Sequence, residues 1–235
     1  MLLTKEKGKV TVFARGARRP GNPFLAAANP FAFGTFQVQE SGSAYRLIQV
    51  EIRNYFREIS EDMESACYGS YFLEFADYYA RENDDGGDAA AAALRGFAGT
   101  AQSQKLDNCL IRYTFELRTM AEGGEYPQVF QCTVCGSDQN LCAIWPKKNS
   151  VLCKHCRTRI SGSIPVLEST IYTMQYMITT PPQRLFAFTV SAQVRKELVK
   201  EIDDFRCRYI DRHFRSLEIL DMMQQTRNAL YKDGY

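Results

Sequence analysis

The stretch Cys132-Thr-Val-Cys135-Gly136, followed further on by Cys153-Lys-His-Cys156, decides how this chain is organised. Seventeen residues separate Cys135 from Cys153, and two C-x-x-C pairs at that separation are typical of a four-thiolate zinc site. The two residues inside each pair allow a tight turn that aims both sulfurs at one ion, and Gly136 relieves the backbone after the first turn. Four thiolates form the closed tetrahedral shell of structural zinc, which leaves no position for water or substrate. We therefore predict a structural Zn²⁺ held by Cys132, Cys135, Cys153 and Cys156.

Two alternatives for these cysteines stay open, because they can also be ordinary buried thiols or a pair of disulfides. Buried thiols rarely fall into two matched pairs, and nothing in the sequence indicates secretion. Cys142 and His155 lie in the same stretch and can in principle replace a ligand. His155 stands between two better-placed thiols and Cys142 has no partner at the same spacing, so we expect neither to bind the ion.

Composition is that of an ordinary globular protein. The chain has 235 residues, 45% of them hydrophobic and 24% charged, which allows one large or two small domains with a real core. No run approaches the roughly 18 apolar residues of a membrane span, and Lys5, Glu6 and Lys7 occupy the place of a signal peptide's apolar segment. We expect a cytoplasmic protein without a membrane segment, whose cysteines are reduced or metal-bound.

The charges are segregated along the chain although the net charge is only +2. Residues 1–57 contain nine Lys or Arg against three acids, residues 58–88 one against ten, and residues 132–160 five against one. This pattern favours basic segments that meet a polyanion, separated by an acidic one. The alternative is that each run is simply a solvated face.

The N-terminal part reads as a small antiparallel β unit. Residues 8–15 alternate as a strand, and a loop rich in glycine, proline and arginine follows at 16–23. Two further strands are predicted at 31–40 and 45–52, joined by a hairpin turn at 41–43.

From about Asn54 the apolar period becomes helical. His213 falls on the apolar stripe of the last predicted helix, and we expect it to be a satisfied core residue and not a ligand. The helices are predicted at 63–79, 106–120 before Gly123-Gly124, 169–178, and 191–220 with Ser191 as its N-cap; a looser one is possible at 89–93.

Several sequence motifs follow one another in a specific order along the chain, each of them once. They are Leu3-Thr-Lys-Glu-Lys-Gly8-Lys9, Phe13-Ala-Arg15-Gly16-Ala-Arg18-Arg19-Pro20, Ala44-Tyr45-Arg46-Leu47, Ala66-Cys67-Tyr68-Gly69-Ser70-Tyr71-Phe72-Leu73-Glu74, Ala76-Asp77-Tyr78-Tyr79, Gly124-Glu125-Tyr126-Pro127, the two cysteine pairs, and His213-Phe-Arg-Ser-Leu217. Together they resemble the RecO family of bacterial DNA repair and recombination mediators, in its zinc-bearing branch. The resemblance covers nearly the whole chain.

The resemblance implies an α+β fold in which an N-terminal OB-fold β-barrel precedes a helical domain with a four-cysteine zinc ribbon. We expect a DNA-binding domain at 1–55 and a helical domain at 56–235, with the zinc-binding insertion at about 130–160. An OB-fold has about five strands, and only three clear strands precede the helices here. Met1–Thr4 reads as the end of an earlier strand, so we expect an incomplete barrel with exposed strand edges. A second departure is Lys147-Lys-Asn-Ser150, which stands where the family usually has glycines.

The family's activity is not enzymatic and uses no small-molecule substrate. The resemblance implies binding of single- and double-stranded DNA, annealing of complementary strands, and assistance to RecA loading on DNA coated with single-strand-binding protein, in the RecF pathway and together with RecR. It also implies a nucleoid-associated location. OB-type surfaces hold single strands with a basic groove and stacking aromatics, and the predicted DNA contacts are Lys5, Lys7, Lys9, Phe13, Arg15, Arg18 and Arg19.

Phe13 shares a predicted strand face with Lys9 and Arg15, but it can equally be a core residue. The family also binds the acidic, apolar-ended tail of single-strand-binding protein on its helical domain, and a basic rim on the last predicted helix suits such a tail. That rim consists of Arg195, Arg206, Arg208, Arg212 and Arg215.

Two other classes of protein are weighed against this one. A zinc deaminase needs an H-x-E type motif and an open metal position, and neither histidine of this chain is followed by Glu at that spacing. A zinc-ribbon protein of the transcription or translation apparatus shares the thiolates and the basic charge but does not predict helical blocks on both sides of the ribbon. No G-x-x-x-x-G-K loop is present, which argues against ATP use.

Overall fold

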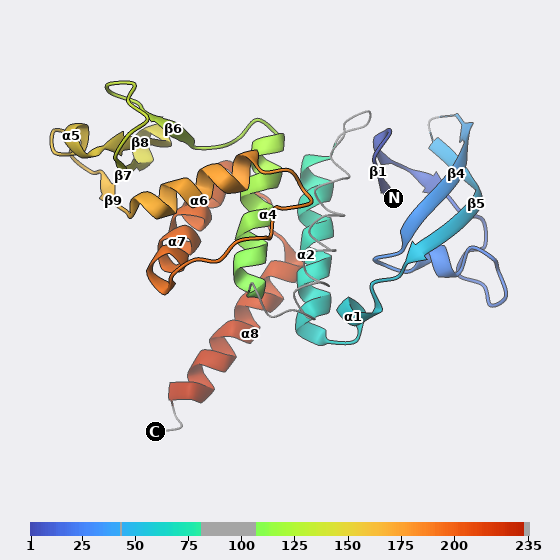
Figure 1. Cartoon of the computed structure of the whole chain (residues 1–235). Helices are drawn as coiled ribbons and strands as arrows, with labels where there is room; N and C mark the ends of the chain where they lie inside the picture. The colour runs from blue at the N-terminus through green and yellow to red at the C-terminus, as the bar shows by residue number, and fades with distance from the viewer. Residues whose placement is uncertain (43, 81–106, 233–235) are drawn as a thin grey trace. The chain divides into compact units, whose positions relative to one another are not determined.

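The computed structural model describes residues 1–42, 44–80 and 107–232, with side chains up to residue 226. The fold class is α+β, as predicted. The chain divides into two compact units: unit 1 comprises Met1–Ser103 and His213–Tyr235, and unit 2 comprises Gln104–Arg212. A domain boundary after residue 55 stays a prediction. The elements of both units are labelled in Figure 1.

Unit 1 begins with short strands that form two sheets. β1 pairs antiparallel with β2, and a second sheet has the order β3-β5-β4. The long β4–β5 hairpin turns at Gly42, whose φ of 64° requires a residue that tolerates the left-handed region. The strands are β1 (Leu2–Thr4), β2 (Gly8–Val10), β3 (Val12–Phe13), β4 (Phe33–Ser41) and β5 (Ala44–Asn54), with a short 3₁₀ turn η1 (Ala26–Ala28) before β4.

Residues 8–15 contribute a strand to each of the two sheets, although they were predicted as one strand of an antiparallel unit. Its first part (β2) pairs antiparallel with β1, and its second part (β3) pairs parallel with β5. The change occurs at Thr11, whose carbonyl accepts a hydrogen bond from Tyr45 N at 2.9 Å. Alternation alone could not reveal this, because a strand that changes partner keeps its period of two. Among the described residues these strands do not close into a barrel.

The helical part of unit 1 is held by aromatic side chains. Its helices are α1 (Arg57–Ser60), α2 (Met63–Tyr79) and α8 (Arg215–Lys232). Asp62 caps α2 by accepting from Ser65 N at 2.8 Å. Phe214 packs its ring 5.5 Å from those of Tyr71 and Phe75 at the start of α8. This cluster fixes α8 to α2, and Ser216 adds a 2.7 Å hydrogen bond to Glu74.

The helical part of unit 2 consists of α4 (Asn108–Glu122), α6 (Glu168–Thr179) and α7 (Ala192–Tyr209). The predicted N-cap is confirmed, since Ser191 Oγ accepts from Val194 N at 3.3 Å. Every residue of α4 from Leu110 to Leu117 is buried, so α4 is the central helix of this unit. In Figure 1, α4 lies beside α6 and α7.

A small sheet with the strand order β6-β8-β7-β9 completes unit 2. We call it, with its turns, the four-cysteine module (residues 128–165). Gln175 on α6 donates a 2.7 Å hydrogen bond to Val129 O and so fixes the module to the helices. Its elements are β6 (Gln128–Cys132), β7 (Leu141–Trp145), η2 (Pro146–Lys148), β8 (Ser150–Cys153), α5 (Lys154–Arg157) and β9 (Ile164–Pro165).

The prediction of one long helix from Ser191 to Leu220 was wrong. The helix ends at Tyr209, the chain is extended at Ile210 (φ −116°, ψ 108°), and a new helix starts at Arg215 in unit 1. The apolar period continues across the break because Ile210 and Phe214 are both buried. His213 is not a core residue either, since its side chain is 69% exposed and lies 2.6 Å from Glu218 Oε1.

The possible helix at 89–93 lies outside the described residues. Among the helices that are described, none is both long and apolar enough to span a bilayer.

Candidate metal centre and nucleic-acid interface

Strand pairing brings the two cysteine pairs together. Cys132 ends β6 and Cys153 ends β8, and these two strands run parallel, with Cys132 opposite Val151. Because parallel strands end at the same edge of a sheet, the turn after each strand meets the other. The first turn is closed by Gly136 N, which donates to Cys132 O at 2.8 Å, and Gly136 has a φ of 74°. The role predicted for this glycine is thus confirmed.

The four sulfur atoms lie where one ion would hold them. All four Sγ atoms lie within 4.8 Å of one another, and Cys135 Sγ is 3.7 Å from Cys153 Sγ. Zinc–sulfur bonds of about 2.3 Å in a tetrahedron place sulfurs about 3.8 Å apart. The donor set therefore fits a closed ZnS₄ shell. The cysteines described here are free thiols and not disulfides.

The pKa values of two of the four thiols, Cys132 and Cys156, are shifted in opposite directions. Burial acts to raise the pKa of Cys132, but backbone N–H groups of Cys153, Cys135 and Val134 outweigh it and lower the pKa to about 6. Burial and hydrogen bonding to the other three sulfurs raise the pKa of Cys156 to about 12. Since one thiolate forms readily and like charges then oppose the next, a bound divalent ion is what would favour all four thiolates.

The two residues expected not to bind the ion lie outside this group of four. Cys142 sits in β7, where its sulfur is 3.9 Å from an Arg157 guanidinium nitrogen. His155 is exposed on α5.

The residues predicted to contact DNA fall into two groups in unit 1. Lys7 and Lys9 are engaged within the protein. Lys7 Nζ lies 3.1 Å from Tyr45 Oη and 3.4 Å from Glu40 Oε1, and these hydrogen bonds raise its pKa. Lys9 Nζ lies 2.7 Å from Asp77 Oδ1. Lys5 is exposed at the β1–β2 turn.

The second group forms an exposed surface, which we call the arginine loop (Phe13, Arg15, Arg18 and Arg19). The three arginines are exposed and form no ion pair within the described parts of the chain. Hydrogen bonds from Arg19 N to Gly16 O and from Asn22 N to Arg19 O fold the loop into successive turns. Phe13 is 65% exposed, so the alternative that it is a core residue was wrong.

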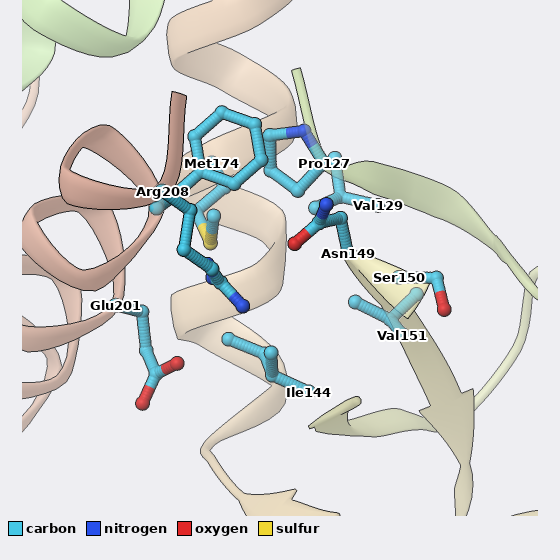
Figure 2. A pocket seen from close by; sticks show the side chains of 10 residues that line it. Pro127, Val129, Ile144, Asn149, Ser150, Val151, Met174, Glu201 and Arg208 are labelled. Atoms are coloured by element: carbon cyan, nitrogen blue, oxygen red, sulfur yellow. The ribbon is translucent and has the colours of Figure 1, made fainter. Parts of the chain in front are cut away.

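A second feature of interest is an apolar pocket within unit 2, between the four-cysteine module and the helices. Its apolar wall comprises Pro127, Val129, Ile144, Val151, Met174 and Phe205. Arg208 extends into it from α7, as Figure 2 shows, and donates to Pro146 O at 2.8 Å. The next residues after Pro146, Lys147 and Lys148, are exposed. The lining acid Glu201 is neutralised by Lys200 at 3.0 Å, so the mouth of the pocket is basic.

The other arginines of the predicted basic rim have different surroundings. Arg195 pairs with Asp107 at 2.7 Å, and Arg206 pairs with Asp203 at 2.7 Å. Arg212 ends unit 2 and Arg215 begins α8 in unit 1. Of this set, Arg208 alone lines the apolar pocket.

One site had no signal in the sequence. Tyr55 and Arg57 line a second pocket in unit 1 together with residues near η1. Tyr55 belongs to no periodic stripe and Arg57 is only one of nine cations in residues 1–57, so only the folded chain brings them to one place with the residues near η1.

The fold and the site define an α+β protein that combines a β unit with exposed cations, a helical body and a four-cysteine module. The model of the recombination protein O N-terminal family matches residues 1–56, and that of its C-terminal family matches residues 60–218. The chain therefore belongs to the RecO family of DNA repair and recombination proteins. This family consists of recombination mediators without an enzymatic activity.

Curated relatives agree over nearly the whole length. The chain is 29% identical to the DNA repair protein RecO of Symbiobacterium thermophilum, covering 97% of this chain and 91% of the relative. It is 27% identical to that of Exiguobacterium sibiricum (94% and 88%) and 24% identical to that of Bacillus subtilis (97% and 89%).

Proposed function

We propose that this chain binds single- and double-stranded DNA, anneals complementary strands and, with RecR, helps RecA to load on DNA coated with single-strand-binding protein. The observation that carries the proposal is the arginine loop, where three arginines that have no acidic partner in the described part of the chain stand beside an exposed phenylalanine. Unpaired arginines favour phosphate contacts, and an exposed aromatic ring favours base stacking. Membership of the RecO family supports the proposed binding of RecR.

The four-cysteine module is proposed to bind one structural Zn²⁺ through Cys132, Cys135, Cys153 and Cys156. The sulfur positions support this assignment, and the ion would supply folding free energy and no chemistry on a substrate. The ion would fix the two turns of the module, and so hold in place the strands β6 and β8, which supply part of the wall of the apolar pocket.

That apolar pocket is the proposed site for the tail of single-strand-binding protein. The tail is acidic and ends in an apolar residue, so it needs an apolar cleft with cations at its mouth. Met174 and Phe205, each 2% exposed, form the apolar floor of a pocket of about 10 Å³, so an apolar end group enters only when Arg208 moves aside, and Arg208 with Lys147 supplies the positive charge. Arg208→Ala should weaken binding of a tail peptide, whereas Arg195→Ala should not, because Arg195 is already paired with Asp107.

A strand-annealing assay tests the central proposal. Complementary labelled oligonucleotides, alone or coated with single-strand-binding protein, should pair faster in the presence of the protein at low salt. The triple variant Arg15→Gln, Arg18→Gln, Arg19→Gln should lose most of this acceleration. A zinc-ribbon protein of the transcription or translation apparatus would not speed pairing, so an unchanged rate with the native chain would refute the proposal.

A further inference from the structure

Unit 1 contains a pocket of about 510 Å³ that lies outside the arginine loop. This volume is within the range of about 300–1,000 Å³ that small-molecule sites occupy. Its walls come from two segments, the chain around η1 and the end of β5 with α1. The lining residues are Ala26, Asn29, Pro30, Phe31, Tyr55, Arg57 and Ser60.

The backbone at this pocket adopts conformations that bulky residues avoid. Phe56 has a φ of 45° and Phe31 a φ of 66°, and such values cost energy unless the surroundings enforce them. Phe56 is 1% exposed and its N–H donates to Asn54 Oδ1 at 2.8 Å. Since Phe56 points into the core, its neighbours Tyr55 and Arg57 are both left to line the pocket.

The polar groups of the pocket have spare binding capacity. The Arg57 guanidinium carbon lies 5.8 Å from the centre of the Tyr55 ring, and Arg57 forms no ion pair with the described residues. The side-chain amide of Asn29 likewise has no hydrogen bond to the rest of the described chain. An aromatic face, an unpaired guanidinium and a free amide are the groups that stack on a base, contact a phosphate and read a base edge.

We propose that this pocket binds one unstacked nucleobase of a single strand, stacked on Tyr55, with the adjacent phosphate on Arg57 and the base edge toward Asn29. The inference rests on the proposed function and adds to it a site that duplex DNA cannot use, because paired bases are not available for stacking on a side chain. It also separates two roles in unit 1. The arginine loop holds the backbone of either form of DNA, and the Tyr55 pocket favours the single strand.

The test compares two oligonucleotides of equal length, one of thymidines and one whose sugars carry no bases. Tyr55→Ala should weaken binding of the thymidine strand about 5- to 150-fold, the loss of one stacked base, and should leave binding of the base-free strand and of duplex unchanged. Tyr55→Phe should bind like the native chain. Arg57→Gln should weaken the binding of both strands. It should also reduce the salt slope, which is the decrease of log affinity per unit of log salt concentration, by about 0.7. Tyr172→Ala in unit 2, where Tyr172 is 68% exposed, is the matched control.

A thymidine strand carrying 5-iodouracil should photocrosslink to Tyr55 in the full chain. Equal losses on both strands for Tyr55→Ala, or crosslinks at other residues only, would overturn the inference while leaving DNA binding intact. A native chain that binds neither strand in dilute buffer overturns the proposed function as well. Should Tyr55→Ala fail to fold, the crosslink decides the question, because it is measured on the native chain.

Discussion

Lys9 Nζ lies 2.7 Å from Asp77 Oδ1 and donates to the Asp77 carbonyl at 3.1 Å. Both side chains are about 30% exposed, 28% for Lys9 and 31% for Asp77, so this pair joins β2 to the end of α2 in a partly shielded position. Arg18 and Arg19, predicted from the same basic segment, form no ion pair within the described chain. The cations of the N-terminal segment are thus divided into some that hold the fold and others that remain available to a ligand.

This division predicts different effects of neutralising each kind of cation. The double variant Arg18→Gln, Arg19→Gln should lower the salt slope of single-strand binding by about 1.4, since each lost phosphate contact removes about 0.7. The measurement is the affinity for an oligonucleotide over a series of salt concentrations. Unfolding by denaturant should be unchanged in this variant because neither side chain has an ion-pair partner among the residues that the structure describes.

Lys9→Gln is the matched control for that experiment. It should cost about 0.5–1 kcal/mol of stability, as expected for a partly exposed pair, because Asp77 loses its cation. Its salt slope should match that of the native chain. If Lys9→Gln reduces the slope as much as a single arginine change does, the division between structural and ligand-binding cations is wrong.

Removal of the proposed zinc ion should affect the two units unequally. Metal binding by the four thiolates contributes directly to folding, so chelation or Cys153→Ser should increase hydrogen exchange at residues 125–165. Binding of DNA through the arginine loop should survive this change better, because that loop belongs to unit 1. Metal content measured by mass spectrometry should be one zinc per native chain. Cys142→Ser should keep the ion, since Cys142 lies outside the group of four.

Equal loss of DNA binding and of module protection on mild chelation would contradict this independence. A native chain purified without stoichiometric metal would contradict the zinc assignment itself.

The sequence was sufficient for features that are encoded locally. Cys132 and Cys135 are three positions apart on one turn, and the parallel pairing of β6 with β8 brings the second turn to the same edge. Ser191 was recognisable as a cap because its hydroxyl needs only Val194 N, three residues on. Such contacts depend on a few neighbouring residues, so pattern and spacing specify them.

Features that depend on distant partners could not be predicted in this way. The break between α7 and α8 leaves the apolar period intact, and Phe214 is drawn into an aromatic cluster with Tyr71 and Phe75, far away in the chain. The Tyr55 pocket likewise needs the segment around η1 to meet the end of β5. Lys9 could not be told from Arg18 by sequence, because its partner Asp77 lies 68 residues away.

The lowered pKa of Glu197 predicts that the folded protein loses stability in acid. Burial acts to raise the pKa of this carboxyl group, but hydrogen bonds from Thr170, Gln193 and Leu167 N outweigh it and lower the pKa below 4.5. The carboxylate thereby joins α7 to the start of α6, with distances of 2.6 Å to Thr170 Oγ1 and 2.9 Å to Leu167 N. A lowered folded pKa gives stability that is present above pH 4.5 and is lost as the pH falls through the folded value.

Glu197→Gln should therefore be less stable than the native chain by about 1.5–3 kcal/mol at pH 7, the value of hydrogen bonds to a charged group. The difference should shrink as the pH falls below 4.5, because the native carboxyl group then becomes neutral too. Urea unfolding midpoints measured from pH 7 to pH 3 test this. A stability difference that stays constant over this range would show that the charge of Glu197 is not what stabilises α6. Asp211→Asn, at an exposed position between α7 and α8, should not change the midpoint at pH 7.

The close packing around Gly69 fixes the position of Phe31, which forms part of the wall of the Tyr55 pocket. A Cβ atom at this position of α2 would lie 2.7 Å from Ile59 Cγ2 and 2.8 Å from Phe31 Cε1. Ile59 is fully buried and Phe31 is 9% exposed, so neither can move away freely. Alanine would gain about 1 kcal/mol of helix propensity, whereas overpacking costs about 1–3 kcal/mol. Gly69→Ala should thus destabilise unit 1 in thermal unfolding and, by displacing Phe31, weaken binding of the thymidine strand more than that of duplex. Ser70→Ala on the same helix should do neither, and a Gly69→Ala chain as stable as the native one would show that the contact between α2 and Phe31 is loose.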